Sequence, residues 1–233
     1  MTAPWLSLLC PSCRPDDLRR WLESLHTHCV NPLGVEVSLT VEERVDTLER
    51  ARWGAVREIF VPHGAFSVNE LTELCYQQST APYIFLSGDD TICRTKDWDL
   101  RFKAELQKYP DDVVLIYPND LIFGRALACY PVTSRLVMDA VPWPVPYQRY
   151  AIDDTIFDIV PAERRVYLED VVMEHLHLVD HPPGHPVQRD GRTMYYPHDV
   201  EAMTRDRALY SARQPERDRI RRELADRMTT AVS

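Results

Sequence analysis

Short apolar runs and amphipathic segments alternate along the first part of the chain. Residues 6–10 form an apolar run that predicts a strand. The apolar residues between 18 and 25 recur with the spacing of one helix face, and Pro15 suits the first turn of that helix. In residues 35–41, valine and leucine alternate with polar residues, which predicts a second strand.

The next segment repeats the order of strand and helix. A short apolar run at residues 59–61 predicts a third strand. Ser67 and Glu70 form a capping-box signature, which predicts the start of a helix. Residues 83–86 are uniformly apolar, as is typical of a central strand that is buried on both faces.

The alternation continues through the second half of the chain. Three prolines in residues 141–147 exclude regular structure and predict an extended loop. The further elements that we expect are a helix at 98–106, a strand at 113–117, helices at 134–141 and 152–160, β segments at 166–168 and 171–173, and a helical C-terminal tail. This order predicts an α/β fold with helices on both faces of a mostly parallel sheet, which binds ligands beyond the carboxyl ends of its strands.

Composition narrows the classes of function. The apolar share of 45% and the charged share of 27% are those of an ordinary globular protein. The formal net charge of -9 argues against general affinity for nucleic-acid phosphates, although residues 205–227 hold eight arginines against five acidic residues. We interpret that segment as a solvated helix of mixed charge. Seven glycines, none spaced two apart, exclude both the dinucleotide-binding fingerprint and the P-loop.

The expected location follows from what the sequence lacks. No apolar run approaches the ~18 residues of a membrane span, and the N-terminus lacks the basic start and cleavage site of a secretory signal. We therefore expect a cytoplasmic protein without a membrane span, whose six cysteines are reduced thiols.

Three polar clusters stand at predicted strand ends or at a helix start. They are Asp89 with Asp90, Asp153 with Asp154, and His175 with His177. Adjacent carboxylates repel each other, and a bound divalent cation is one way to relieve that repulsion. Each cluster taken alone has a second interpretation, because aspartate is frequent in helix caps and turns.

On these residues the chain resembles the family 2 glycosyltransferases and their GT-A fold, over most of its length to about residue 210. The matching segments, in order, are LSLLCPSCRPDDLRRWLESL, NELTELCYQQSTAPYIFLSGDDT, DVVLIYPND, ALACYPVTSRLVMDAV, AIDDTIFDI and VVMEHLH. The resemblance implies a GT-A-type catalytic domain at 1–185, with the nucleotide-binding part at about 1–120 and the acceptor side at about 121–185. A C-terminal helical extension at 186–233 completes the expected chain.

The resemblance also implies a role for each cluster. Asp90 and either His175 or His177 hold Mn²⁺ or Mg²⁺ against the donor diphosphate, and Asp153 or Asp154 is the catalytic base. The residues expected at the donor nucleotide are Pro11, Ser12, Arg14, Glu42, Asn69, Ser87, Gly88 and Asp89. Those expected at the acceptor are Trp143, Tyr147 and Arg149. The sequence departs from the family where Ser87 replaces the first aspartate of the D-x-D motif.

The implied reaction is transfer of a sugar from a nucleotide-sugar donor, with a UDP-sugar favoured, to an acceptor hydroxyl with inversion. The acceptor is not identified: a glycan, a small molecule and a hydroxylated base in DNA all fit.

Other functions remain open at this point. Cys10 and Cys13 form a C-x-x-C pair between a strand and a helix, which is a pattern of thiol-disulfide oxidoreductases. The same two cysteines with His26 and His28 form a weaker zinc pattern. The arginine-rich tail and the aromatic residues near Arg149 also fit a nucleic-acid-binding protein.

Overall fold

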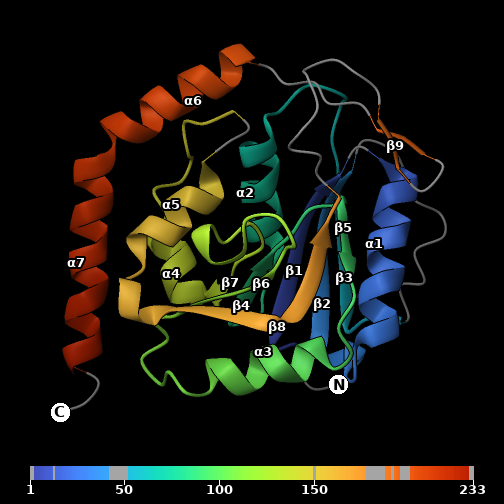
Figure 1. Cartoon of the computed structure of the whole chain (residues 1–233), viewed down its shortest axis with the longest axis horizontal. Coiled ribbons are helices and arrows are strands. Elements are labelled where there is room, and N and C mark those ends of the chain that lie inside the picture. Colours follow the sequence, from blue (N-terminus) through green and yellow to red (C-terminus); the bar gives the residue numbers. More distant parts are fainter. Residues whose placement is uncertain are drawn as a thin grey trace.

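The computed structural model shows one curved sheet with helices on both faces (Figure 1). The structure describes residues 3–12, 14–41, 52–148, 151–176, 187–189, 192–194 and 200–230. Within these ranges an eight-stranded sheet has the order β3-β2-β1-β4-β7-β6-β8-β5. Its strands are β1 (Leu6–Ser12), β2 (Val35–Val41), β3 (Ala55–Phe60), β4 (Tyr83–Leu86), β5 (Thr91–Cys93), β6 (Leu115–Asn119), β7 (Val132–Ser134) and β8 (Arg165–His175). A separate two-stranded sheet pairs β9 (Val187–Arg189) with β10 (Arg192–Met194).

The predicted, mostly parallel character of the sheet is confirmed. Strands β3, β2, β1 and β4 run parallel to one another, and β6 is parallel to β8. Because β7 is antiparallel to both β4 and β6, those two strands also run in one direction. The carboxyl ends of β1, β4, β6 and β8 therefore meet at one edge, which is where ligands bind in sheets of this kind.

Seven helices lie in the described residues, and most were expected from the sequence. They are α1 (Pro15–His28), α2 (Val68–Gln78), α3 (Trp98–Leu106), α4 (Arg135–Ala140), α5 (Ile152–Ile159), α6 (Val200–Ala212) and α7 (Gln214–Thr230). The predicted capping box is confirmed: the Ser67 hydroxyl accepts from the Glu70 backbone N–H, and the Glu70 carboxylate accepts from the Ser67 N–H. These two bonds satisfy backbone N–H groups that have no partner within the helix, and they therefore fix where α2 begins.

One prediction about the strands was wrong in detail. The β segments expected at 166–168 and 171–173 belong to one continuous strand, β8. Its pairing with β6 shifts register after Pro118, so the residues between the two segments bulge out of the ladder. A bulge of this kind leaves polar residues unpaired in the middle of a strand, so the sequence pattern suggests two separate strands.

Alternate side chains of the central strands enter two separate cores. Leu8 and Phe85 join the cluster beneath α1 and α3, whereas Leu9 and Ile84 join the cluster shared by α2, α4, α5 and α7. This is the period-two geometry of a strand that is covered on both faces. The interpretation of residues 83–86 as a central buried strand is confirmed.

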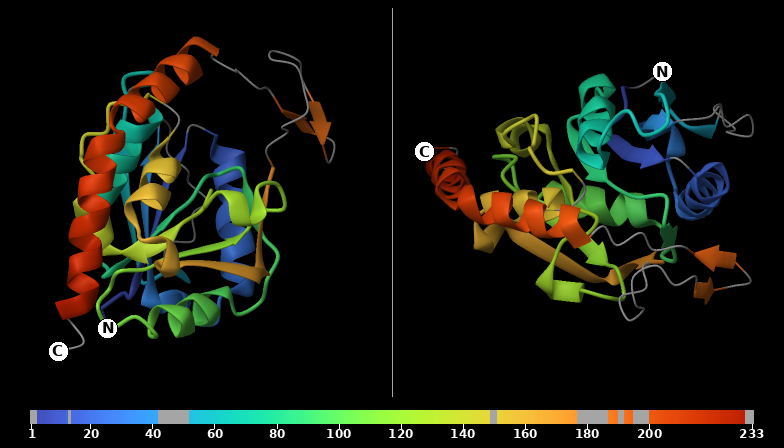
Figure 2. Two further views of the ribbon diagram at one scale, coloured as in Figure 1. Left: turned by 60° about the vertical axis from the view of Figure 1, so that its left-hand side comes forward. Right: turned by 90° about the horizontal axis from the view of Figure 1, so that it is seen from above.

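The C-terminal helices complete the second core. Figure 2 shows α6 and α7 running along one side of the sheet, where α7 packs on α5. Ile220 and Leu224 are buried there, and the Arg217 guanidinium, 1% exposed, lies 3.2 Å from Asp158 Oδ2. Several other arginines of this segment form ion pairs within α7, in agreement with the interpretation of a mixed-charge helix. None of the described helices has the length and apolar character needed to cross a membrane.

Candidate active site

The carboxyl edge of the sheet gathers the first of the predicted polar clusters. Asp89 lies just beyond β4, next to the end of β1, and its side chain is 6% exposed. Its carboxylate accepts from Ser12 Oγ at 2.6 Å and from both Nε and one terminal nitrogen of Arg14. Both carboxylate oxygens of Asp89 are thus engaged by the turn that follows β1.

Burial and the contact between Asp89 and Arg14 together shift the pKa values of both groups. Burial raises the pKa of Asp89, and the Arg14 guanidinium opposes that rise. Burial also acts on Arg14, but the Asp89 carboxylate outweighs it and raises the pKa of the guanidinium. The two-point contact favours a carboxylate over a neutral acid, so we treat the pair as charged at neutral pH. Arg14 remains 45% exposed and offers its outer face to a ligand.

Four further residues expected at the donor are packed against other parts of the protein. Ser87 Oγ accepts from Trp21 Nε1 at 2.9 Å, and Asn69 Nδ2 donates to the Tyr147 carbonyl at 2.9 Å. A Cβ at Gly88 would lie 2.6 Å from Asp90 Oδ1, so a larger residue there would displace the Asp90 carboxylate. Pro11 lies inside β1, paired with β2. Their contact with a nucleotide stays a prediction, and Glu42 lies outside the described residues.

The second cluster joins Asp90 to His175. Strand β5 pairs antiparallel with β8, with Thr91 opposite His175, and this pairing brings the two side chains together. His175 Nε2 lies 3.6 Å from Asp90 Oδ2, and the Tyr130 hydroxyl donates to Asp90 Oδ1 at 3.4 Å. Burial opposes ionisation of Asp90, but His175 and Arg14 prevail and lower its pKa to about 2. His177, the alternative partner, lies outside the described residues.

The Asp153–Asp154 pair opens α5, and its two carboxylates face different surroundings. Burial and then the charge of Asp154 raise the pKa of Asp153, which lies close enough to His175 to interact with it. Burial and then Asp158 raise the pKa of Asp154, on which Arg217 also acts. Asp153 therefore interacts with His175 at the sheet edge, whereas Arg217 of α7 acts on Asp154, and both carboxylates act on Cys129.

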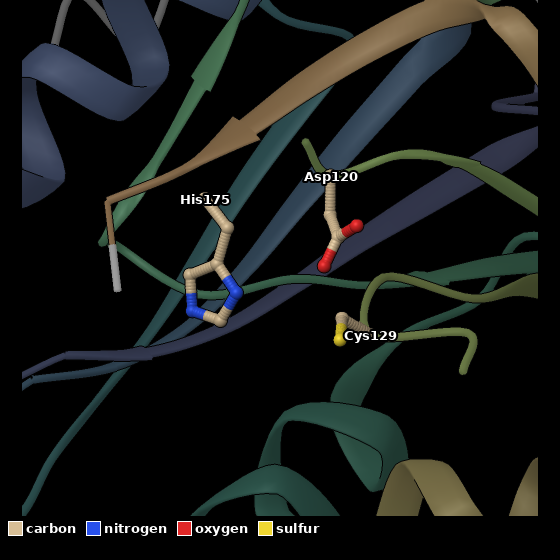
Figure 3. A group of neighbouring side chains, drawn as sticks. All are labelled: Asp120, Cys129 and His175. Carbon is tan, nitrogen blue, oxygen red and sulfur yellow. The ribbon is translucent and has the colours of Figure 1, made fainter. Parts of the chain in front are cut away.

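Two residues of this edge had no role in the sequence prediction. Asp120 follows β6 and is 2% exposed, and Cys129 lies in the loop before β7. Figure 3 shows both side chains pointing toward His175. The position of Asp120 at a strand end was a usable signal, whereas nothing in the sequence around Cys129 indicates a site.

The residues expected at the acceptor make internal contacts. The Trp143 ring stacks on Tyr76 with centroids 5.9 Å apart, and its Nε1 donates to the Met138 carbonyl at 3.0 Å. Tyr147 is 3% exposed and packs beside Tyr210. Both rings therefore stabilise the proline-rich loop, and their contact with an acceptor stays a prediction. Arg149 lies outside the described residues.

The geometry of Cys10 argues against the thiol chemistry considered above. Cys10 is fully buried within β1, and burial together with the Asp89 carboxylate raises the pKa of its thiol well above the ordinary value. A reactive cysteine needs a partly exposed, electropositive position. Among the described residues, Cys10, His26 and His28 do not form a group whose potential ligand atoms lie close together, which argues against the zinc pattern. Cys13 lies outside the described residues.

The donors at Asp90 fit a divalent cation that is shared with a ligand. The side chains of Asp90 and His175 are 27% and 12% exposed, so both reach the surface of the edge. Asp89 does not fit as a third ligand, because Ser12 and Arg14 occupy its oxygens. Ions such as Mg²⁺ commonly use one or two protein side chains and complete their shell with phosphate oxygens and water.

Comparison with known proteins identifies the fold. No family model matches the chain, and no curated protein sequence matches it. The mannosyltransferase PcManGT from Pyrobaculum calidifontis, solved with GDP-Man and Mn²⁺, is 12% identical with a TM-score of 0.58, over 77% of this chain and 59% of that chain. S. aureus TarS (residues 1–349) is 14% identical with a TM-score of 0.59, over 97% of this chain and 72% of that chain.

A third similar structure is glucosyl-3-phosphoglycerate synthase from Mycobacterium tuberculosis with Mn²⁺, UDP and glucosyl-3-phosphoglycerate. It is 13% identical with a TM-score of 0.51, over 74% of this chain and 72% of that chain. The chain spans about three fifths of the length of PcManGT. These likenesses show that the chain has the GT-A glycosyltransferase fold, as the sequence predicted.

Proposed function

We propose that this protein is a glycosyltransferase that moves a sugar from a nucleoside-diphosphate sugar to an acceptor hydroxyl. The observation that carries the proposal is the meeting of Arg14, Asp90, Asp153 and His175 at the carboxyl edge of a GT-A sheet. Solved proteins of this fold include one with GDP-Man and Mn²⁺ and one with Mn²⁺ and UDP. A cation, a guanidinium and a buried carboxylate are the groups that such a transfer needs.

The donor diphosphate would bind between Arg14 and Asp90. The exposed face of Arg14 supplies positive charge, and Asp89 holds the guanidinium in place from behind. Asp90 and His175 Nε2 would hold Mn²⁺ or Mg²⁺, and an imidazole ligand among oxygens favours Mn²⁺. When bound, that ion neutralises charge on the leaving nucleoside diphosphate. We propose a UDP-sugar as the favoured donor.

Asp153 would act as the general base. Of the two adjacent carboxylates it is the one that interacts with His175, and therefore the one at the sheet edge. Asp153 accepts the proton of the acceptor hydroxyl while the hydroxyl oxygen attacks the anomeric carbon. The bond from that carbon to the diphosphate breaks on the opposite side, so the anomeric configuration inverts. A base with a raised pKa matches this task better than an ordinary aspartate does at neutral pH.

Thermal stabilisation by ligands tests the proposal. The purified chain is melted with a panel of nucleoside diphosphates and nucleotide sugars, each with and without Mn²⁺. A ligand present at 100 times its dissociation constant adds about 2.7 kcal/mol of stability. We expect one nucleotide to raise the melting temperature in the presence of Mn²⁺. A panel in which no nucleotide changes the melting temperature contradicts the proposal.

The acceptor is sought with the donor that this panel identifies. Transfer of radiolabelled sugar is measured to glycans, small hydroxylated molecules and DNA that contains a hydroxylated base. DNA as the acceptor predicts binding that weakens steeply with salt, because phosphate contacts release counterions. Absence of DNA binding at low salt removes that candidate and leaves the glycan and small-molecule acceptors.

A further inference from the structure

Three potential metal ligands of different chemistry meet at the sheet edge, beside the site proposed for the diphosphate. Asp120, Cys129 and His175 come from three separate segments, and each offers one ligand atom within 4.8 Å of the others. Figure 3 shows their side chains converging on one point. The set combines a carboxylate oxygen, a thiol sulfur and an imidazole nitrogen.

The two carboxylate oxygens of Asp120 differ, because only one of them accepts hydrogen bonds from the backbone. Its Oδ1 accepts from the backbone N–H groups of Ile122, Phe123 and Gly124 at 3.1, 2.9 and 2.9 Å. Its Oδ2 is buried and receives no hydrogen bond of ordinary geometry from the described residues. A buried polar atom without compensation costs about 1–3 kcal/mol, and more when the group is charged. A cation beside Oδ2 would remove this cost.

His175 presents its two ring nitrogens to two different carboxylates. In Figure 3 the nitrogen next to Cγ, Nδ1, faces Asp120 and Cys129. The other nitrogen, Nε2, lies 3.6 Å from Asp90 Oδ2. The backbone N–H of His175 donates to the Asp120 carbonyl at 3.1 Å, which fixes the two residues relative to each other. A histidine that binds metal through one nitrogen commonly directs the other to a carboxylate.

We propose that Asp120, Cys129 and His175 Nδ1 form a zinc site, with Asp90 orienting the imidazole from outside. Thiolate, imidazole and carboxylate are the three ligand types of protein zinc sites, and a thiolate ligand disfavours Mg²⁺ and Mn²⁺. On binding, the Cys129 sulfur exchanges its proton for a bond to zinc, and the proton leaves to solvent.

This site shares His175 with the ion proposed for the donor diphosphate. A neutral imidazole has one acceptor nitrogen, so a ring that binds zinc through Nδ1 carries its hydrogen on Nε2. That ring cannot also bind Mn²⁺ through Nε2. Zinc should therefore weaken Mn²⁺-dependent nucleotide binding, and this consequence, unlike zinc binding itself, rests on the proposed function.

Cobalt(II) is the probe that tests the zinc site without any nucleotide. Chelator-treated protein is titrated with Co²⁺ while the absorbance is followed. We expect one ion per chain, a sulfur-to-cobalt charge-transfer band, and displacement of that band by Zn²⁺. Cys129→Ser should abolish the band, and Asp120→Asn and Asp90→Asn should each weaken binding, the latter by about 10- to 100-fold as for a partner outside the ligand set.

Matched cysteine variants decide which thiol is responsible. Cys29→Ser and Cys13→Ser should keep the band, and circular dichroism with thermal melting confirms that every variant is folded. Absence of the band from the wild type, or its survival in Cys129→Ser, overturns the zinc site. In a second measurement Zn²⁺ is added to the Mn²⁺–nucleotide complex. Cobalt binding without antagonism would keep the zinc site and contradict the shared use of His175.

Discussion

Asp90 and Asp153 differ in their surroundings although each belongs to a pair of adjacent aspartates. Burial alone would raise the pKa of Asp90. The neighbouring His175 and the positive charge of Arg14 outweigh burial and lower this pKa to about 2. For Asp153, burial and then the like charge of Asp154 raise the pKa. The same dipeptide thus yields one carboxylate that stays ionised and one that binds a proton readily.

The difference assigns the two carboxylates to different tasks. A group that stays charged across the working pH range suits a cation or a diphosphate complex. A group with a raised pKa suits proton transfer, because its pKa comes closer to the pH of the solution. The partners, rather than the dipeptide, decide which task each residue can perform. Substitutions at the two pairs test this contrast, beginning with the largest expected effect.

The largest effect is expected from removal of the proposed base. Asp153→Asn should lower the turnover number by about 10²- to 10⁴-fold with little change in donor affinity, because only proton transfer is lost. Asp154→Asn is the matched control and should lower turnover far less. Both are measured by sugar transfer at saturating donor. Equal losses in the two variants would contradict the assignment of Asp153 as the base.

The next effect concerns the ion at Asp90. Asp90→Asn should remove the Mn²⁺-dependent stabilisation by nucleotide, which is about 2.7 kcal/mol at 100 times the dissociation constant. Asp89→Asn should weaken nucleotide binding yet keep its dependence on Mn²⁺, since Asp89 holds Arg14 instead of the ion. Melting curves with and without Mn²⁺ separate the two variants. Loss of the Mn²⁺ dependence in Asp89→Asn would reverse their roles.

Asp153 and Asp90 should make the free energy of unfolding depend on pH in opposite directions. The raised pKa of Asp153 means that its ionised form destabilises the fold, so this cost is absent below about pH 3.8 and grows as pH rises through the raised pKa. Asp153→Asn should therefore be more stable than the wild type at pH 8, by about 1 kcal/mol or more, since a tenfold change in proton affinity on folding corresponds to about 1.4 kcal/mol.

Asp90 provides the opposite case in the same experiment. Its lowered pKa stabilises the fold above the ordinary value of 3.8, and this contribution disappears as pH falls toward 2. Asp90→Asn should be less stable than the wild type at pH 8, with a deficit that shrinks in acid. Urea unfolding at several pH values gives both curves. The same sign for both variants would show that the neighbouring charges do not control these groups.

The smallest effect is a change in the pH profile. Activity should fall in acid at a pH above the ordinary aspartate value of 3.8, because Asp153 must be ionised to accept a proton. In Asp154→Asn one negative neighbour is gone, so the acid limb should move to lower pH, by about one pH unit or less. The profile of turnover at saturating donor measures this. An unmoved limb would mean that burial alone sets the pKa of Asp153.

The local elements were largely predictable from the sequence. Helix α2 begins where Ser67 and Glu70 can satisfy each other's backbone donors, and the apolar run of β4 places Asp89 and Asp90 at a strand end. These features depend on neighbours a few residues apart, so their physics is visible in the chain itself. The GT-A fold followed from the order of such elements and is confirmed.

The contacts between distant segments were not predictable in this way. Ser87 follows β4 directly, and only the packing of α1 shows that its hydroxyl accepts a hydrogen bond from Trp21. The residues that converge on His175 come from loops that follow or precede β6, β7 and β8, and no spacing relates Cys129 to Asp120. Their meeting depends on strand order and register, which the sequence does not express locally.

The sequence by itself determined the class of fold and the strand ends that carry carboxylates, and it suggested the chemistry that we propose for them. Only the tertiary structure decided that Asp89 holds Arg14, that Asp90 faces His175, and that Asp153 rather than Asp154 interacts with His175. The physical reason is that strand and helix propensities act over a few residues, whereas the charge state and partner of a carboxylate depend on burial and on groups contributed by the whole sheet.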